Sequence, residues 1–559
     1  MIENNSIPVI DIFAGPGGLG EGFSSLLNDN GERIFKIRLS VEKDPHAHQT
    51  LKLRSFFREF NIGQVPDDYY AFIRGEITFN ELYERYPEQA AAANAEACCG
   101  TLGEPDEGDT YALTNEEVDN RIQVALDGSA NWVLIGGPPC QAYSLVGRSR
   151  RQEKILDEAK DKRVGLYKEY LRIIAVHKPA VFVMENVKGI LSAKTEENQI
   201  FNKILDDLSD PVGACIFEGE ITDNNQPHVQ YKIYSLTKLP DNYDINSNPV
   251  FKPSDFIIKS EEYGIPQKRH RVILLGIREG VPVPENVLRR QEEVSLSSVI
   301  GKLPEVRSGI TREFTHFTIG TDVDGKLKKK RHYRKINDSF EKWSAYMEGF
   351  NNQINNILGI EQEQPVDFPE ILGAEFLPIE GPDLPEHHPL LSWYSDDNLR
   401  GLLHHISRKH LLQDIKRYLF ASRYVEQHGK FPRLEDYRLA GEDLMPDHEN
   451  AESGKFTDRF RVQLPDIPAT TVTSHISKDG HYFIHYDPNQ SRSFTVREAA
   501  RVQTFPDNYY FCGGRTQQFH QVGNAVPPYL AYQIAKVVAE IFTQISIQNN
   551  QGNEAVRAI

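Results

Sequence analysis

The stretch PVIDIFAGPGGLGEGF, residues 8–23, decides the fold. It begins with an apolar run of strand length, and the glycine-rich turn that follows leads into a helix. Gly15, Gly17 and Gly20 match the G-x-G-x-x-G spacing that nucleotide-binding folds place between a strand and a helix. Glycine lets the backbone approach a ligand closely. The stretch therefore predicts an α/β protein with a ligand at the carboxyl edge of its sheet.

A second strand is expected over residues 35–41, and it ends at Glu42. In nucleotide-binding folds an acidic residue at about this distance beyond the glycines binds ribose hydroxyls. The motif does not separate NAD from other adenosine-bearing cofactors, so an NAD-dependent oxidoreductase is one open alternative. Asp109, in Gly108-Asp109-Thr110, either meets the ligand at another strand end or is a plain turn aspartate.

A third buried strand, residues 132–135, is followed by GGPPCQAYS at residues 136–144. Two glycines and two prolines stop any regular element, so the chain turns and presents Cys140 at the carboxyl end of a strand. A cysteine on a rigid turn suggests a nucleophile, although a small buried apolar cysteine is the alternative. The basic loop at 145–152 is either a mobile lid that touches phosphate or a solvated loop.

Glu185 follows another predicted strand, residues 180–184. A buried carboxylate is costly unless it is used or paired. In a parallel sheet it would lie at the same edge as Cys140, where a thiol and an acid suit covalent catalysis. The alternative is a helix-capping or ion-paired glutamate. Three further polar residues would share one face of a strand that ends near 276, suited to an anionic substrate or to solvent: Gln267, Arg269 and Arg271.

Composition narrows the class of protein. The 559 residues suffice for two to four domains, and the hydrophobic fraction of 39% supplies a core without any run of membrane-spanning length. The amino-terminal residues lack the layout of a signal peptide, and five cysteines without a CxxC pair indicate a reducing compartment. We therefore expect a cytoplasmic protein without a metal site and without membrane contact.

The charge distribution points in two directions. A formal net charge of −17 argues against a polyanionic partner, but a local basic face is what binds phosphates. The α/β rhythm is lost over about 280–490, where residues 326–335 and 404–410 form two basic clusters. The clusters predict phosphate contact, with a solvated face as the alternative. Residues 361–388, acidic and Pro-rich, are expected to be a loop.

The remaining pattern predicts helices and short strands. Thr495 and Glu498 form a capping box at the start of a helix. The other expected elements are a mainly helical insertion over 51–105, helices beginning at 115 and spanning 166–177 and 493–503, strands over 470–473 and 482–485, and a polar turn at 521–528 before a final helix that ends near 542.

Six segments, in this order, resemble the motifs of bacterial-type DNA (cytosine-5)-methyltransferases: 11–23, 139–141, 185–187, 267–271, 497–501 and 523–528. The resemblance covers residues 8–280 and 490–545. It implies the doubly wound, mostly parallel sheet of S-adenosylmethionine-dependent methyltransferases. This sheet would belong to a catalytic and cofactor-binding domain over 1–280. A second, irregular target-recognition domain would occupy 281–490, and 491–559 would return to the catalytic domain.

The resemblance also implies the cofactor and the site. S-adenosyl-L-methionine would be held by Phe13, Gly15, Gly17, Gly18, Leu19, Glu42, Asp109, Asn524 and Val526. The target cytosine would leave the duplex, and Cys140 would attack its C6 as a thiolate. Glu185 would hold N3 and the exocyclic amine and supply a proton. Arg269 and Arg271 would support the flipped nucleotide. The insertion after residue 50 departs from the short bacterial pattern and leaves the alignment of Asp109 open.

The implied function is site-specific methylation of double-stranded DNA, in restriction-modification or phage defence. A companion nuclease or defence proteins would be its partners. A tRNA methyltransferase of the same chemistry is an alternative, although the large recognition region favours duplex DNA. A DNA-binding module with a vestigial site is another. An oxidoreductase leaves Cys140 and Glu185 unexplained, and a zinc base deaminase needs a second cysteine that residues 139–143 lack.

Overall fold

The computed structural model describes residues 6–103, 108–138, 162–191, 197–217, 219–222, 228–321, 327–361, 366–381, 383–445 and 460–557. The predicted nucleophile Cys140 and the predicted lid at 145–152 lie outside these ranges. Within them, no helix is both long and apolar enough to cross a membrane.

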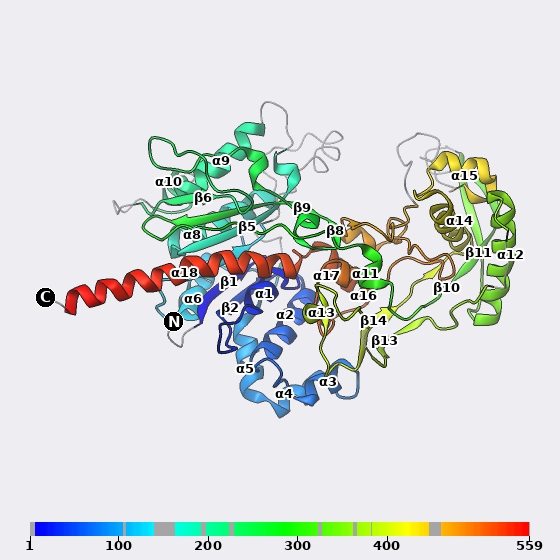
Figure 1. The fold of residues 1–559 in the computed structure, drawn as a ribbon, viewed down its shortest axis with the longest axis horizontal. Coiled ribbons are helices and arrows are strands. Elements are labelled where there is room, and N and C mark those ends of the chain that lie inside the picture. Colours follow the sequence, from blue (N-terminus) through cyan, green and yellow to red (C-terminus); the bar gives the residue numbers. More distant parts are fainter. Residues whose placement is uncertain are drawn as a thin grey trace.

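Among the described residues, eight strands form one open sheet in the order β3-β2-β1-β4-β5-β9-β6, with β7 beside β9 (Figure 1). They are β1 (Ile7–Ile12), β2 (Phe35–Glu42), β3 (Ala97–Cys99), β4 (Val133–Gly136), β5 (Val181–Val187), β6 (Tyr231–Tyr234), β7 (Ile257–Lys259) and β9 (His270–Arg278). The first five pair in parallel, and β9 is antiparallel to its three neighbours. The predicted mostly parallel α/β sheet is confirmed. Its strand order reverses between β1 and β4, which is where open sheets bind ligands.

Helices cover both faces of this sheet. Adjacent residues of β1 serve opposite cores, because Val9 packs toward α1 and α18 while Ile10 packs toward α6 and α8. These helices are α1 (Gly18–Ser24), α6 (Asn115–Leu126), α8 (Lys162–His177) and α18 (Pro528–Arg557), and α9 (Glu197–Ser209) and α10 (Pro211–Phe217) add to the second face. The sheet is therefore doubly wound, as predicted.

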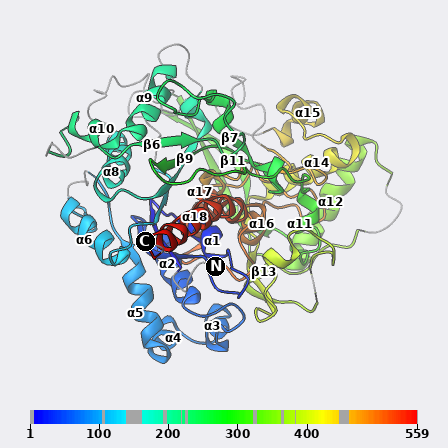
Figure 2. The same ribbon diagram turned by 60° about the vertical axis from the view of Figure 1, so that its left-hand side comes forward.

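The carboxyl-terminal helix α18 lies against α1 at the start of the chain (Figures 1 and 2). Two glycines of α1 make this close crossing feasible. A Cβ atom at Gly18 would stand 2.2 Å from the carbonyl oxygen of Val526, and one at Gly22 would stand 2.4 Å from Ala531 Cβ. The final helix runs to Arg557, beyond the end near 542 that the sequence predicted.

The segment predicted to be mainly helical, residues 51–105, is helical as far as Glu96, but the sheet strand β3 lies inside its predicted range. The helical insertion consists of α2 (Pro45–Arg58), α3 (Asp67–Ile73), α4 (Phe79–Arg85) and α5 (Pro87–Glu96), between β2 and β3. Its aromatic core, which includes Phe56 and Tyr69, also packs against Leu403 of a distant segment. The Tyr70 hydroxyl donates a 2.7 Å hydrogen bond to Asp396. The insertion thus braces the sheet against the region beyond residue 280.

The region predicted as irregular contains long helices and antiparallel strand pairs. It holds α11 (Leu296–Ile300), β10 (Gly309–Ile310), β11 (Arg312–Thr321), β12 (Leu327–Lys335), α12 (Phe340–Leu358), β13 (Gly373–Pro378), α13 (Leu391–Tyr394), β14 (Gly401–Ile406), β15 (Lys409–His410), α14 (Leu412–His428) and α15 (Leu434–Ala440). The loop expected over 361–388 is wrong in part, because β13 lies inside it and pairs with β14. The strand expected at 482–485 is also wrong, since only isolated bridges form at Ile484.

The carboxyl-terminal segments mix confirmed and corrected predictions. In α16 (Val496–Val502), Thr495 Oγ1 accepts from the Glu498 amide, and the carboxylate of Glu498 accepts from the Thr495 amide, so the predicted capping box is confirmed. The first half of the turn predicted at 521–528 is instead the end of α17 (Arg515–Asn524), whose Phe519 and Val522 are buried at helical spacing. Both helices share a core with residues 294–303, so the domain boundary at 490 stays a prediction.

Candidate active site

A cavity of about 880 Å³ opens at the carboxyl ends of β1, β2, β4 and β5. Ten residues predicted from the sequence line it: Phe13, Gly15, Gly18, Leu19, Glu42, Glu185, Arg269, Arg271, Asn524 and Val526. Residues from both ends of the chain meet here because α18 returns to α1. The volume lies within the range of about 300–1,000 Å³ that is usual for small-molecule sites. The structure thus gathers most of the predicted site into one space.

The glycine turn forms one wall of the cavity. Phe13, Gly15 and Gly17 all have positive φ angles, of 56°, 59° and 92°. A Cβ at Gly15 would meet nothing within 4 Å, so the turn leaves open space there. Gly17 is absent from the lining, and a Cβ on it would stand 2.7 Å from Leu51 Cδ2, so it serves packing. The Tyr509 hydroxyl donates to a carbonyl of the turn and ties it to the carboxyl-terminal region.

Glu42 holds this turn in shape. Its Oε2 accepts a 2.8 Å hydrogen bond from the amide of Gly15, and its Oε1 accepts a 2.7 Å bond from the amide of Asp44. Burial raises the pKa of the Glu42 carboxyl above its ordinary value, against the lowering effect of these two bonds. A carboxylate offers about four acceptor positions, so both oxygens can still accept from hydroxyl groups of a ligand.

Asp109 does not line the cavity, although the sequence predicted a cofactor contact there. Its carboxylate accepts from Thr101 Oγ1 at 2.7 Å and from the Tyr111 amide at 2.9 Å, and these bonds hold its pKa below the ordinary value. Thr101 and Leu102 form the wall instead, just after β3. The sequence pattern does not indicate these two residues because β3 has only three residues, although a strand that ends at the same edge of the sheet is a usable signal.

Glu185 lies beside the end of β4, as the parallel pairing of Gly136 with Met184 requires. Arg271 Nε is 2.7 Å from Glu185 Oε1, and each side chain is 14% exposed. The other oxygen, Oε2, faces the next turn, since a Cβ on Gly137 would stand 2.9 Å from it. Glu185 is therefore both ion-paired and open to the cavity. Its free oxygen points toward the chain segment that leads to Cys140.

The predicted single polar face of the arginine strand is wrong. The strand breaks at Arg269, so β8 (Gln267–Lys268) pairs with β16 (Ala469–Thr470) while β9 stays in the main sheet. The Gln267 side chain is fully buried and donates to the carbonyl of Val502. The Arg269 amide donates to the carbonyl of Gln267 in a tight turn, so Gln267 is directed away from the cavity that Arg269 and Arg271 both line.

Arg269 is a bridge between distant segments. It is 2% exposed, and its Nη1 donates to the carbonyls of Val472, at 2.7 Å, and Gly523, at 3.4 Å. Burial and the neighbouring Arg271 hold its pKa well below the ordinary value. Its Nε has no hydrogen-bond partner among the described residues, which leaves one buried donor beside the cavity.

The two basic clusters predicted from the sequence differ in their exposure to solvent. The cluster at 404–410 is wrong as a phosphate contact, because His404, His405 and His410 are buried. Burial lowers the pKa of each, to about 4 for His405, so these imidazoles are neutral at physiological pH. The sequence could not reveal this burial, because a run of basic residues has the same composition whether it is buried or exposed. The cluster at 326–335 forms β12, which is largely exposed where its side chains are described.

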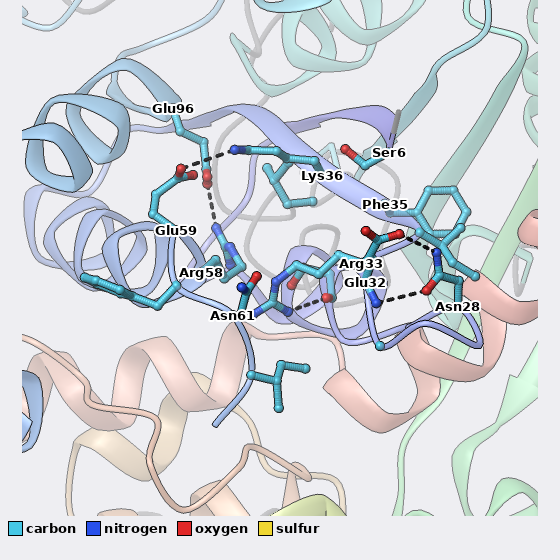
Figure 3. A pocket seen from close by; sticks show the side chains of 16 residues that line it. Ser6, Asn28, Glu32, Arg33, Phe35, Lys36, Arg58, Glu59, Asn61 and Glu96 are labelled. Carbon is cyan, nitrogen blue, oxygen red and sulfur yellow. Dashed lines mark hydrogen bonds and ion pairs between the residues drawn. The ribbon is translucent and has the colours of Figure 1, made fainter. Parts of the chain in front are cut away.

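Figure 3 shows a second cavity, of about 310 Å³, at the amino ends of β1 and β2. Charged side chains in it pair with one another: Lys36 with Glu59 at 3.2 Å, and Arg58 with Glu96 at 2.5 Å. None of the sequence-predicted site residues lines it. The larger cavity at the opposite edge of the sheet is therefore the candidate active site.

The family model described as C-5 cytosine-specific DNA methylase matches residues 110–211 and 251–540. The chain belongs to this family. It is 30% identical over 546 residues to the type II methyltransferase M.Bpa9945I of Bacillus paralicheniformis, covering 95% of this chain and 98% of that protein. The type II methyltransferase M.DdeI of Desulfomicrobium norvegicum is 24% identical, with coverage of 99% and 93%.

The DNA (cytosine-5-)-methyltransferase M.ApeKI of Aeropyrum pernix is 24% identical to this chain, and the match covers 74% of this chain and 82% of that protein. The predicted resemblance is confirmed, and this DNA methylase transfers a methyl group to C5 of cytosine in DNA. The family decides against the oxidoreductase alternative and favours DNA over tRNA.

Proposed function

We propose that this chain is the modification enzyme of a type II restriction-modification system, with S-adenosyl-L-methionine as methyl donor and Cys140 as nucleophile. One observation carries the proposal: the Glu185–Arg271 pair and the turn at Gly15 face the same cavity. A carboxyl group and a glycine turn that could hold a methyl donor, both at one edge of the sheet, suit methyl transfer to a nucleotide base. The relatives named as type II methyltransferases support the biological role.

The residues around the glycine turn fit S-adenosyl-L-methionine. The open space beside Gly15 admits a ligand, and Glu42 offers acceptors for ribose hydroxyls. Phe13, Leu19 and Val526 supply apolar surface for the adenine, and Asn524 is exposed on the same wall. Gly17 and Gly18 would act through the shape of the turn, and Asp109 through Thr101. When bound, the cofactor supplies an activated methyl group.

The chemistry we propose uses Cys140 for the covalent bond and Glu185 for the proton at N3. The Cys140 thiolate forms a bond to C6 of the cytosine while Glu185 Oε2 gives a proton to N3. C5 gains electron density and accepts the methyl group, whose donor would be left as a neutral thioether. Water then takes the C5 proton, the bond between the Cys140 sulfur and C6 breaks to restore the thiolate, and the N3 proton returns to Glu185. Arg271 holds Glu185 in place, and the Nε of Arg269 supports the nucleotide.

We propose duplex DNA with a flipped cytosine as the substrate, since a stacked base keeps C6 out of reach of a side chain. Residues 281–490 would recognise the target sequence, and 1–280 with 491–559 would carry the chemistry. A companion nuclease that cuts the unmodified sequence, or other defence proteins, would be the partner. An enzyme that guards cellular DNA in this way would act in the cytoplasm.

Bisulfite sequencing of DNA from cells that express the chain tests this proposal. Cytosines in one recurring sequence are expected to resist conversion with the unaltered chain and with Cys215→Ala, a matched control on α10. All cytosines should convert with Cys140→Ala. Protection that survives in Cys140→Ala, or protection without a common sequence, would contradict the proposal.

A further inference from the structure

The buried side chain of Arg54 joins the helical insertion to the glycine turn of the candidate active site. Arg54 lies on α2 and is 5% exposed. Its Nε and Nη2 donate to the two carboxylate oxygens of Glu21, at 2.8 and 2.6 Å, and its Nη1 donates to Asn508 Oδ1 at 3.0 Å. All three nitrogens of the guanidinium group therefore donate hydrogen bonds, to two separate parts of the chain.

Two aromatic rings hold the plane of this guanidinium group. Arg54 Cζ lies 3.9 Å from the ring centre of Phe57 and 4.9 Å from the ring centre of Tyr509, which is fully buried. Arginine combines a planar fork of donors with stacking on aromatic rings, and the single ammonium group of lysine cannot reproduce that combination. The orientation of Arg54 is therefore fixed as closely as its position.

Glu21 and Tyr509, which both contact Arg54, also contact the glycine turn. Glu21 lies on α1, and its amide donates a 2.8 Å hydrogen bond to the carbonyl of Gly17. The Tyr509 hydroxyl donates to the carbonyl of Pro16. Pro16 lines the large cavity, whereas Arg54 does not. Arg54 can therefore act on this cavity only through its neighbours.

Stability alone does not account for this arrangement. A buried ion pair adds little net stability, because the cost of removing both charges from water offsets their attraction. The far side of the Arg54 contacts is also held in place. Asn508 Nδ2 donates to Asp396 Oδ2 at 2.6 Å, and the same oxygen accepts from the Tyr70 hydroxyl at 2.7 Å. A rigid fork that is anchored behind and directed toward the turn suits a role in geometry.

We infer that Arg54 is a positioning residue, which holds the glycine turn in its ligand-binding shape through Glu21 and Tyr509. The turn needs such support, because Phe13 has a positive φ of 56° and a non-glycine residue keeps that conformation only where the surrounding structure imposes it. The inference rests on the proposed function for the identity of the ligand, S-adenosyl-L-methionine. It gives the helical insertion a role in cofactor binding.

Affinity for S-adenosyl-L-methionine, measured by calorimetry without DNA, tests the inference. Arg54→Lys keeps the positive charge and removes the fork, so it should weaken binding about tenfold. Tyr509→Phe keeps the ring and removes the hydroxyl that donates to Pro16, so it should weaken binding about fivefold. Both variants leave the residues that line the cavity unaltered.

Arg307→Lys is the matched control, because it removes a similar fork far from the turn. Arg307 is 4% exposed, donates from two nitrogens to the two carboxylate oxygens of Asp338, and lies over the ring of Trp343. It does not line the cavity. Arg307→Lys should lower the melting temperature as Arg54→Lys does, and it should leave the affinity for S-adenosyl-L-methionine unchanged.

Hydrogen–deuterium exchange supplies a measurement that needs no cofactor. Residues 14–20 contain the turn and the start of α1, and the amides of Ala14, Gly15 and Gly17 donate hydrogen bonds there. Exchange over 14–20 should be faster in Arg54→Lys and in Tyr509→Phe than in the unaltered chain. It should be the same in Arg307→Lys as in the unaltered chain.

The outcomes separate a positioning role from a purely structural one. A folded Arg54→Lys variant with unchanged affinity or unchanged exchange over 14–20 would overturn the inference, as would an equal loss of affinity in Arg307→Lys. If Arg54→Lys does not fold, the same two measurements on Tyr509→Phe decide. An unaltered chain that does not bind S-adenosyl-L-methionine would refute the proposed function, and exchange over 14–20 would still show whether Arg54 holds the turn.

Discussion

Replacing Gly137 by alanine should slow methyl transfer without unfolding the protein. The added Cβ would stand 2.9 Å from Oε2 of Glu185, the oxygen that we propose delivers the proton. Gly137 does not have a positive φ angle, so its backbone tolerates alanine. The backbone carbonyl of Glu185 would lie at 3.6 Å, an ordinary contact. The strain therefore falls on the carboxylate alone.

The expected loss of rate in Gly137→Ala follows from the distance that Glu185 Oε2 must move. Ordinary contact begins at 3.4 Å, so Oε2 must move by about 0.5 Å, against the 2.7 Å ion pair that Arg271 makes with Oε1. A misplacement of about 1 Å at a reacting group costs about 100-fold in rate, so half of that shift predicts a loss of about tenfold. This corresponds to about 1.4 kcal/mol in the activation free energy.

Single-turnover methyl transfer at saturating DNA and cofactor measures this loss. Gly349→Ala on α12 is the matched control, because its Cβ would meet nothing within 4 Å. It should keep the full rate and can gain stability from the alanine. The melting temperature of Gly137→Ala should stay close to that of the unaltered protein. A folded Gly137→Ala variant with the full rate would refute the role assigned to Glu185 Oε2.

Three further predictions concern stability and cofactor binding. Gly22→Ala should lower the free energy of unfolding by about 1–3 kcal/mol, because the added Cβ would press on the backbone of α18. An unchanged midpoint of urea unfolding would contradict this close packing. Burial lowers the pKa of His405 to about 4 and also lowers the pKa of His485. The free energy of unfolding should therefore fall as pH drops from about 6.5 toward 4, by about 3 kcal/mol for His405 alone. A flat pH profile would contradict the buried, neutral state of these imidazoles. Glu42→Gln should weaken S-adenosyl-L-methionine binding about tenfold by loss of charge-assisted bonds, as measured by calorimetry, and unchanged affinity would remove Glu42 from the cofactor site.

Much of the sheet was predictable because its strands are short apolar runs that end at glycine, proline or acidic residues. The run at 8–13, the strand ending at Glu42 and the strand entering Glu185 all lie where the sequence placed them. Parallel pairing then brings their carboxyl ends to one edge without further information. Local pattern and topology together account for this part of the site.

The corrected predictions share a different cause. The break at Arg269 depends on the pairing of β8 with β16, which lies about 200 residues away in the sequence. No local sequence pattern predicts this pairing. His404 and His405 form part of β14, whose burial depends on α16 and on its antiparallel partner β13. The turn predicted at Gly523 is helical because Phe519 and Val522 bury one side of it. In each case tertiary packing overrides a signal that was read locally.

The proposed mechanism depends on a covalent bond between Cys140 and C6 of the target cytosine. Duplex DNA with 5-fluorocytosine at the methylated position tests it, because fluorine cannot leave as the C5 proton does and the adduct persists. Mass spectrometry should then find the chain joined to the DNA strand and carrying one transferred methyl group. The adduct should be absent with Cys140→Ser and present with Cys215→Ala. A covalent adduct that survives in Cys140→Ser, or none with the unaltered, active enzyme, would contradict Cys140 as the nucleophile.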